Sequence, residues 1–113
     1  MQISLIQENL SKALTNVSKA IDARPPLPAL GNVLLEAEDS RLRIVASNLQ
    51  MSITQWIGAK VDRPGSITLP AKTFADLVGR LAKERVDLRL DEITNTIYFT
   101  IFNHRYFVDA NIC

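Results

Sequence analysis

The 113-residue sequence has little of what metal-binding and nucleophilic proteins use. It contains one cysteine, Cys113, and one histidine, His104. A single cysteine cannot close an internal disulfide, and one histidine with one cysteine cannot complete a zinc site. We therefore expect no metal, no cofactor and no catalytic residues. A small hydrolase that pairs His104 with Cys113 is a remote alternative, because nothing in the sequence brings the two together.

Other absences exclude further classes of protein. The four glycines (Gly31, Gly58, Gly65 and Gly79) are isolated, so the sequence has no glycine-rich phosphate loop. No apolar run approaches the ~20 residues of a membrane span. The first residues lack a basic segment followed by an apolar one, which is the pattern of a secretory signal. We expect a cytoplasmic protein.

Alternation and helical periodicity predict the elements of the chain. Residues 2–6 alternate as a strand, and apolar residues spaced by three and four predict a helix over about residues 8–22. The prolines of residues 24–28 end that helix. Three strands follow at residues 32–37, 42–47 and 51–59, with links too short for parallel crossovers.

The same order of elements then repeats after about 64 residues. A strand at residues 66–69 precedes a helix that begins near Pro70 and carries Phe74, Leu77, Val78 and Leu81 on its apolar face. Strands follow at residues 86–90, 96–101 and 105–111, and residues 62–65 join the two repeats. Neither repeat can bury a core alone. We therefore predict one α+β domain over residues 1–113, with two helices on one face of a mostly antiparallel sheet, and we expect Leu14 and Leu77 in its core.

The net charge of +1 does not itself indicate a nucleic-acid partner, so the distribution of charge has to be considered. Residues 8–24 and 71–85 contain seven basic and four acidic side chains. The rest of the chain contains six basic and eight acidic side chains. Lys12 and Lys19 lie on nearly one line of the first helix, away from its apolar stripe. This predicts a mildly basic helix layer and a mildly acidic sheet side. An ordinary solvated helix surface remains the alternative. Any nucleic-acid contact should be to phosphates, because the helices lack a dense set of base-reading side chains.

The last predicted strand, residues 105–111, is rich in aromatic and branched side chains and has no proline. As the final strand of a meander it should be an edge, which needs a cover. The cover is either a partner or the chain's own helix.

Three segments resemble the bacterial sliding clamp, the beta subunit of DNA polymerase III. Residues 24–35, "RPPLPALGNVLL", are similar to that family's "GRPTLPILGNLLL" segment. Residues 47–51, "SNLQM", are similar to its "TDLEM" segment, and residues 68–74, "TLPAKTF", to its "TVPARKF" segment. The three occur in the family's order and spacing.

The resemblance implies a DNA-clamp fold and a ring of two chains, each with three such domains, around duplex DNA. In such a ring the helices line the hole, the sheets lie outside, and the ring tethers the replicative polymerase as a non-catalytic processivity factor. The proline corner would then turn an inner helix back to the outer sheet, with Arg24 near the DNA. The expected DNA contacts are Arg24, Lys12, Lys19, Lys72 and Arg80.

The resemblance also implies a subunit interface at the last strand. The residues expected there are Thr73, Phe74, Arg105, Tyr106 and Val108. Alternation puts Tyr106 and Val108 on one face of that strand and Phe107 on the other. Because the resemblance implies that Tyr106 and Val108 are in the contact, we expect Phe107 to pack inward.

The length differs from the family pattern. The chain corresponds to the first of the three domains, and we expect an excised N-terminal domain rather than a short clamp-like protein. Polymerase and clamp loader should bind through domains absent here. A stand-alone protein-interaction module that does not touch DNA is the alternative function.

Overall fold

The computed structural model describes residues 1–101 and 104–109. The helices of this part of the chain are α1 (Gln7–Val17), α2 (Ala71–Arg80) and the short 3₁₀ helices η1 (Ser18–Ala20) and η2 (Pro28–Gly31). Its strands are β1 (Gln2–Ile6), β2 (Asn32–Glu38), β3 (Arg41–Ser47), β4 (Ser52–Gly58), β5 (Lys60–Arg63), β6 (Gly65–Pro70), β7 (Arg85–Asp91), β8 (Thr96–Ile101) and β9 (His104–Asp109). None of these helices is long and apolar enough to span a membrane.

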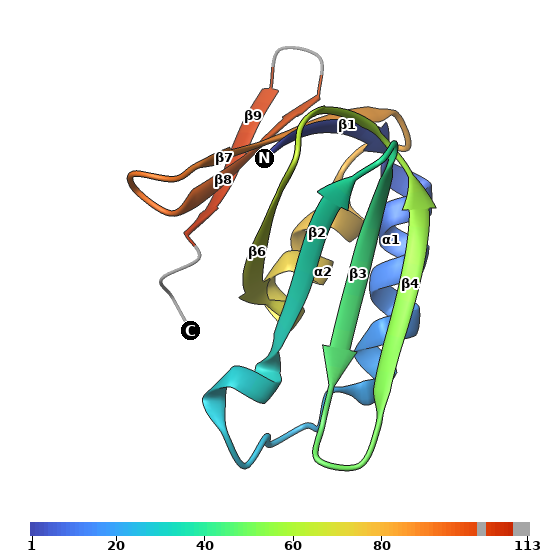
Figure 1. The fold of residues 1–113 in the computed structure, drawn as a ribbon, viewed down its shortest axis with the longest axis vertical. Helices are drawn as coiled ribbons and strands as arrows, with labels where there is room; N and C mark the ends of the chain where they lie inside the picture. The colour runs from blue at the N-terminus through green and yellow to red at the C-terminus, as the bar shows by residue number, and fades with distance from the viewer. Residues whose placement is uncertain (102–103, 110–113) are drawn as a thin grey trace.

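The strands form two antiparallel sheets. One has five strands in the order β5-β1-β7-β8-β9, and the other has four in the order β4-β3-β2-β6. The first strand of each repeat is therefore exchanged. β1 pairs with β7 of the second repeat, whereas β6 pairs with β2 of the first. Both helices lie on the same side of the four-stranded sheet (Figure 1).

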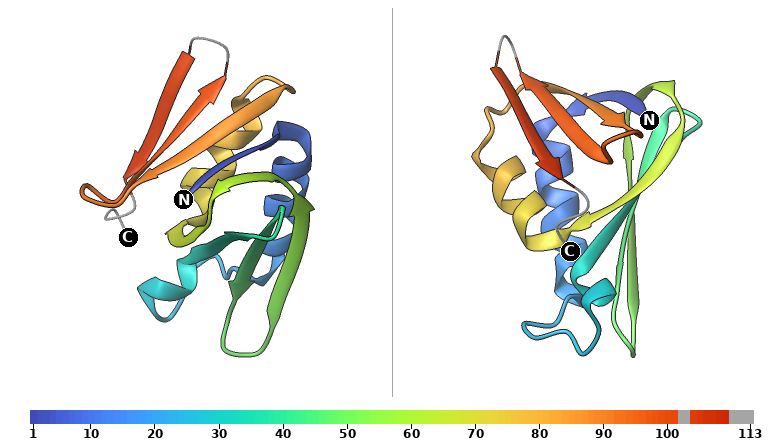
Figure 2. Two further views of the ribbon diagram at one scale, coloured as in Figure 1. Left: turned by 45° about the horizontal axis from the view of Figure 1, so that its top comes forward. Right: turned by 90° about the vertical axis from the view of Figure 1, so that its left-hand side faces the viewer.

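The expected packing of two helices against antiparallel strands is confirmed, and most predicted boundaries agree to within a residue or two. The first helix ends earlier than predicted, at Val17, and continues as η1. The joint between the repeats, expected at residues 62–65, overlaps the end of a strand that was not predicted, β5. This strand follows a corner at Gly58 and Ala59 and pairs with β1, so that the joint closes one edge of the five-stranded sheet (Figures 1 and 2).

The core lies between the helices and the two sheets. Leu10, Leu14 and Val17 of α1 are almost completely buried, and Phe74 of α2 packs on Phe99 of β8 with 5.3 Å between ring centroids. The two helices are also joined by a hydrogen bond, because Gln7 Nε2 donates to the backbone oxygen of Val78 at 2.7 Å. A polar side chain at a helix crossing thus fixes how α1 and α2 lie on each other.

The burial of β9 reverses one expectation. Val108 is only 7% exposed and belongs to the core, whereas Phe107 is 68% exposed, so the prediction that Phe107 packs inward is wrong. The alternation itself holds: Tyr106 pairs with the buried Phe99, and Phe107 pairs with Tyr98 on the opposite face. The prediction failed because it assumed that the face with Tyr106 and Val108, expected to contact a partner, points to solvent.

Leu77 also differs from expectation, since it is only partly buried whereas Leu14 is 1% exposed. We expect Leu14→Ala to lower the free energy of unfolding by about 2–5 kcal/mol, the usual result of a large-to-small change in a core. Leu77→Ala should lower it by less than about 2 kcal/mol, because less apolar area is lost. Thr15→Ala on the exposed face of α1 is the control and should stay within about 0.5 kcal/mol. Urea denaturation measures all three, and an equal loss at both leucines would contradict this core.

Gly65 and Gly79 provide a second test. A Cβ at Gly65 would lie 3.0 Å from Met1 Cβ and 3.1 Å from the Met1 backbone nitrogen. Met1 is itself buried, so Gly65→Ala should lower stability by about 1–3 kcal/mol, as overpacking does. A Cβ at Gly79, within α2, would meet nothing within 4 Å. Gly79→Ala should therefore raise stability by about 0.5–1 kcal/mol. Thermal melts of the two variants should shift in opposite directions.

Candidate nucleic-acid interface

The cations predicted to contact DNA are all exposed on the helix layer or at its exit. Lys12 and Lys19 point away from the buried stripe of α1 and η1, and Lys72 and Arg80 lie on the exposed side of α2. Because α1 packs against α2, these four cations belong to a single layer of the molecule. Arg24 is exposed in the loop that follows η1.

Acidic side chains dilute this layer. Lys12 Nζ forms an i,i+4 ion pair with Glu8 at 3.2 Å, and Asp76 lies between Lys72 and Arg80 along the exposed side of α2. Of the five cations, Lys12 is the one with an ion pair among the described residues, so Lys19, Arg24, Lys72 and Arg80 are more available to an anion. The layer can neutralise a few phosphates and has no arrangement for reading bases.

The β3–β4 turn is joined to the segment that carries Arg24 by one side chain, Asn48, to which the sequence analysis assigned no role. Asn48, after β3, donates from Nδ2 to the backbone oxygen of Ala20 at 2.9 Å. Its Oδ1 accepts the backbone N–H groups of Gln50 and Met51 at 2.8 and 2.9 Å. Asn48 therefore ties the β3–β4 turn to the end of the helix layer. Asparagine is a typical turn residue, but its contact with Ala20 depends on the tertiary fold.

The turn leaves a shallow hollow next to this contact. The hollow measures about 300 Å³ and is lined by Asp22, Asn48, Leu49 and Gln50. Leu49 is 73% exposed at its rim. The β3–β4 turn thus presents an exposed apolar side chain, Leu49, beside the polar side chains of Asp22, Asn48 and Gln50.

The expected acidic sheet side is not found on the five-stranded sheet. Arg85, which the sequence analysis counted with the second helix, is the first residue of β7. Strand register places it on the outer face of that sheet, with four other basic side chains: Lys60, Arg63, Arg89 and Arg105. The contrast between a basic helix layer and an acidic sheet side is therefore wrong, because a count along the chain cannot tell which face a strand residue occupies.

The residues predicted for a subunit interface divide in three ways. Phe74 and Val108 are buried in the core of this single chain. Thr73 is exposed on α2. Arg105 lies on the outer face, with its guanidinium carbon 4.4 Å from the ring centroid of Tyr98. Tyr106 is 38% exposed on the helix side of β9.

β9 is an edge strand of the five-stranded sheet, and among the described strands it pairs only with β8. Tyr106 keeps part of its ring in solvent because no further strand covers it. His104 is exposed at the start of β9, and Cys113 lies outside the described residues. The described residues contain no group of three or more metal-binding side chains.

Two helices packed on two antiparallel sheets, with the first strands of the repeats exchanged and cations on the helix layer, define a domain of the DNA-clamp class. The profile described as "DNA polymerase III beta subunit, N-terminal domain" matches residues 1–106, and the chain therefore belongs to that family.

Relatives and solved structures agree with this assignment. The beta sliding clamp of Synechocystis sp. is 42% identical over 93 residues, which is 80% of this chain and 24% of that protein. The clamp of Synechococcus elongatus is 39% identical, over 81% of this chain and 25% of that protein. The crystal structure of the DNA polymerase sliding clamp of Caulobacter crescentus superimposes with a TM-score of 0.86 at 30% identity, covering 99% of this chain and 31% of that one. The chain thus spans about a quarter of the length of these two cyanobacterial relatives.

Proposed function

We propose that the chain acts as the N-terminal domain of a DNA sliding clamp. The observation that carries the proposal is the match of residues 1–106 to this domain of the DNA polymerase III beta subunit. The exposed cations of the helix layer support it, since a clamp must hold a polyanion without reading its sequence.

In this proposal the domain is the first of three in a chain, and two chains close a ring around duplex DNA. The ring would keep the replicative polymerase on its template and would carry out no chemical step. The polymerase and the clamp loader would bind to domains outside these 113 residues. Such a protein works on the chromosome, so we infer a cytoplasmic location in a bacterium.

Duplex contact is assigned to the helix layer, through Lys12, Lys19, Arg24, Lys72 and Arg80. Phosphate contacts give affinity that falls with salt and does not depend on sequence. Lys12 should contribute least of the five, since it already pairs with Glu8.

The subunit interface is assigned to the edge of β9. A strand from a second chain could add to this edge and bury the exposed part of Tyr106, with Thr73 and Arg105 at the margins. Edge strands present unpaired backbone groups and are readily extended in this way. The side chains of Phe74 and Val108 would support the strand from within.

The first prediction from this proposal concerns duplex DNA. The 113-residue chain should bind a fluorescent duplex weakly, and the affinity should fall steeply with salt. Lys19→Ala with Arg24→Ala should flatten the slope of log K against log salt by about 1.8, because each phosphate contact contributes about 0.9. Arg41→Ala with Arg43→Ala, on the four-stranded sheet, is the charge-matched control. An interaction module that does not use DNA predicts equal slopes for both pairs.

The second prediction concerns the edge. The chain should self-associate weakly through β9, and sedimentation over a concentration series should detect it. Tyr106→Glu should abolish the association by placing a charge where the added strand covers the ring. Phe107→Ser, on the opposite face of the same strand, should leave it unchanged. A wild-type chain that stays monomeric at high concentration would refute the assignment of this edge.

A further inference from the structure

The outer face of the five-stranded sheet carries a band of cations. Directly opposed residues of neighbouring strands share a face, so the register defines two rows that cross all five strands. The first row runs Arg63, Gln2, Arg89, Tyr98, Phe107, and the second runs Lys60, Ser4, Asp87, Thr100, Arg105. From β5 to β9 the rows span four strand spacings, about 19 Å. A shorter third row pairs Asp91 with Thr96 and Thr96 with Asp109.

Most of these cations are free of acidic partners. Arg63, Arg89 and Arg105 form no ion pair with any described residue. The acidic residues of β7 on this face accept hydrogen bonds from nearby groups of the chain. Asp87 accepts from Ser4 Oγ at 2.6 Å and from Arg85, and Asp91 accepts the backbone N–H groups of its own turn. The five basic residues of this face therefore outnumber the three aspartates in its rows, Asp87, Asp91 and Asp109, which leaves a positive excess.

Aromatic rings lie among the cations. The guanidinium carbons of Arg89 and Arg105 are 5.0 and 4.4 Å from the ring centroid of Tyr98, which holds both groups close to the sheet. Phe107 lies beside Tyr98, with 6.3 Å between ring centroids. Phe107 is 68% exposed and packs in no core, so its ring is open to a ligand.

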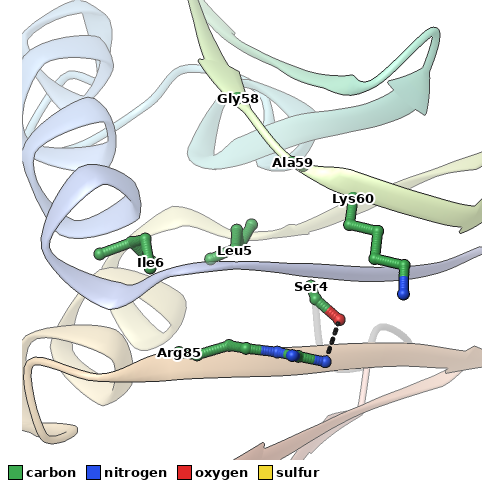
Figure 3. Close-up of a pocket in the computed structure, with 7 residues that line it drawn as sticks. All are labelled: Ser4, Leu5, Ile6, Gly58, Ala59, Lys60 and Arg85. Atoms are coloured by element: carbon green, nitrogen blue, oxygen red, sulfur yellow. Dashed lines mark hydrogen bonds between the residues drawn. The ribbon is translucent and has the colours of Figure 1, made fainter.

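The face is hollowed at two places along the rows. One hollow, of about 440 Å³, is lined by Gln2, Asp87, Leu88, Arg89, Tyr98, Thr100 and Arg105. The other, of about 300 Å³, lies where β1 passes the corner between β4 and β5. There Lys60 and Arg85 flank Ser4 from the two neighbouring strands, and Arg85 donates to Ser4 Oγ (Figure 3). Cations thus border both hollows.

We propose that this outer face binds single-stranded DNA. Each nucleotide supplies a phosphate and a base with a π-face, which matches a surface where cations alternate with an open ring. Phosphates would contact Arg89, Arg105 and Arg63, and one base would stack on Phe107. Duplex DNA fits less well, because its bases are already stacked on one another and cannot reach a ring on a flat sheet. An acidic peptide would satisfy the arginines but would leave Phe107 without a partner.

The inference goes beyond the proposed function and uses a different surface. The helices cover the opposite face of the five-stranded sheet (Figure 2). Single-stranded DNA bound to the outer face would therefore lie on the other side of the molecule from the proposed duplex contacts. The proposed function supplies only the reason for choosing DNA as the polyanion. The positive charge, the aromatic rings and the hollows of this face are observed in the structure and do not depend on the proposed function.

The test is fluorescence anisotropy of a labelled oligo(dT) strand with the 113-residue chain and its variants. Phe107→Ala should weaken binding about fivefold or more, the loss expected for one stacked base. Ile93→Ala is the matched control, because Ile93 is an apolar side chain 97% exposed in the β7–β8 turn. Arg89→Ala with Arg105→Ala should flatten the salt slope by about 1.4, since each contact with a single strand contributes about 0.7. Arg41→Ala with Arg43→Ala should leave that slope unchanged.

Several outcomes would overturn the inference. The first is unchanged oligo(dT) affinity in both the Phe107 and the arginine variants, with all of them folded by circular dichroism. The second is loss of oligo(dT) binding in Lys19→Ala with Arg24→Ala alone, which would place the strand on the helix layer. The third is that polyglutamate displaces oligo(dT), and does so equally well from the wild type and from the Phe107→Ala variant. That result would make the face a site for acidic peptides. Failure of duplex binding with intact oligo(dT) binding would refute the proposed function only.

Discussion

The fold depends on the exchange of first strands between the two repeats. β1 completes the sheet of the second repeat by pairing with β7, and β6 completes the sheet of the first by pairing with β2. A repeat taken alone would keep its three-strand meander and its helix but would lose the strand that its sheet needs at one side. The side of β1 that bonds to β7 and the side of β6 that bonds to β2 find their backbone partners only when both repeats are present. The two halves must therefore fold as one cooperative unit.

This exchange also determines where the surfaces lie. Because each sheet takes strands from both repeats, the two helices are brought together, and Gln7 can bond to Val78 across their contact. Their outward sides then form one layer with Lys12, Lys19, Lys72 and Arg80. The opposite faces of the strands turn to solvent. One domain thereby presents a sparse cationic layer on its helices and a cationic, aromatic face on its five-stranded sheet.

The two surfaces differ in the ligand they fit. The helix layer has cations diluted by Glu8 and Asp76 and has no exposed ring among its DNA-contact candidates, which suits transient contact with the phosphates of a duplex. The outer sheet face combines arginines held against Tyr98 with the exposed ring of Phe107. That combination suits bases that are free to stack. Apart from Arg24, the residues of both surfaces lie on helices and strands rather than on loops.

The sequence by itself determined the elements and their order, because hydrophobic periodicity and proline positions are local properties. It therefore predicted the first helix with Leu14 in the core, the meanders and the repeat, and resemblance identified the family. β5 was missed because its four residues form a strand only by pairing with β1. The orientation of Phe107 and Val108, the partial burial of Leu77 and the cationic outer face were decided by the tertiary structure. Alternation says which side chains share a face, but only the packing of helices against one side of a sheet decides which face is buried.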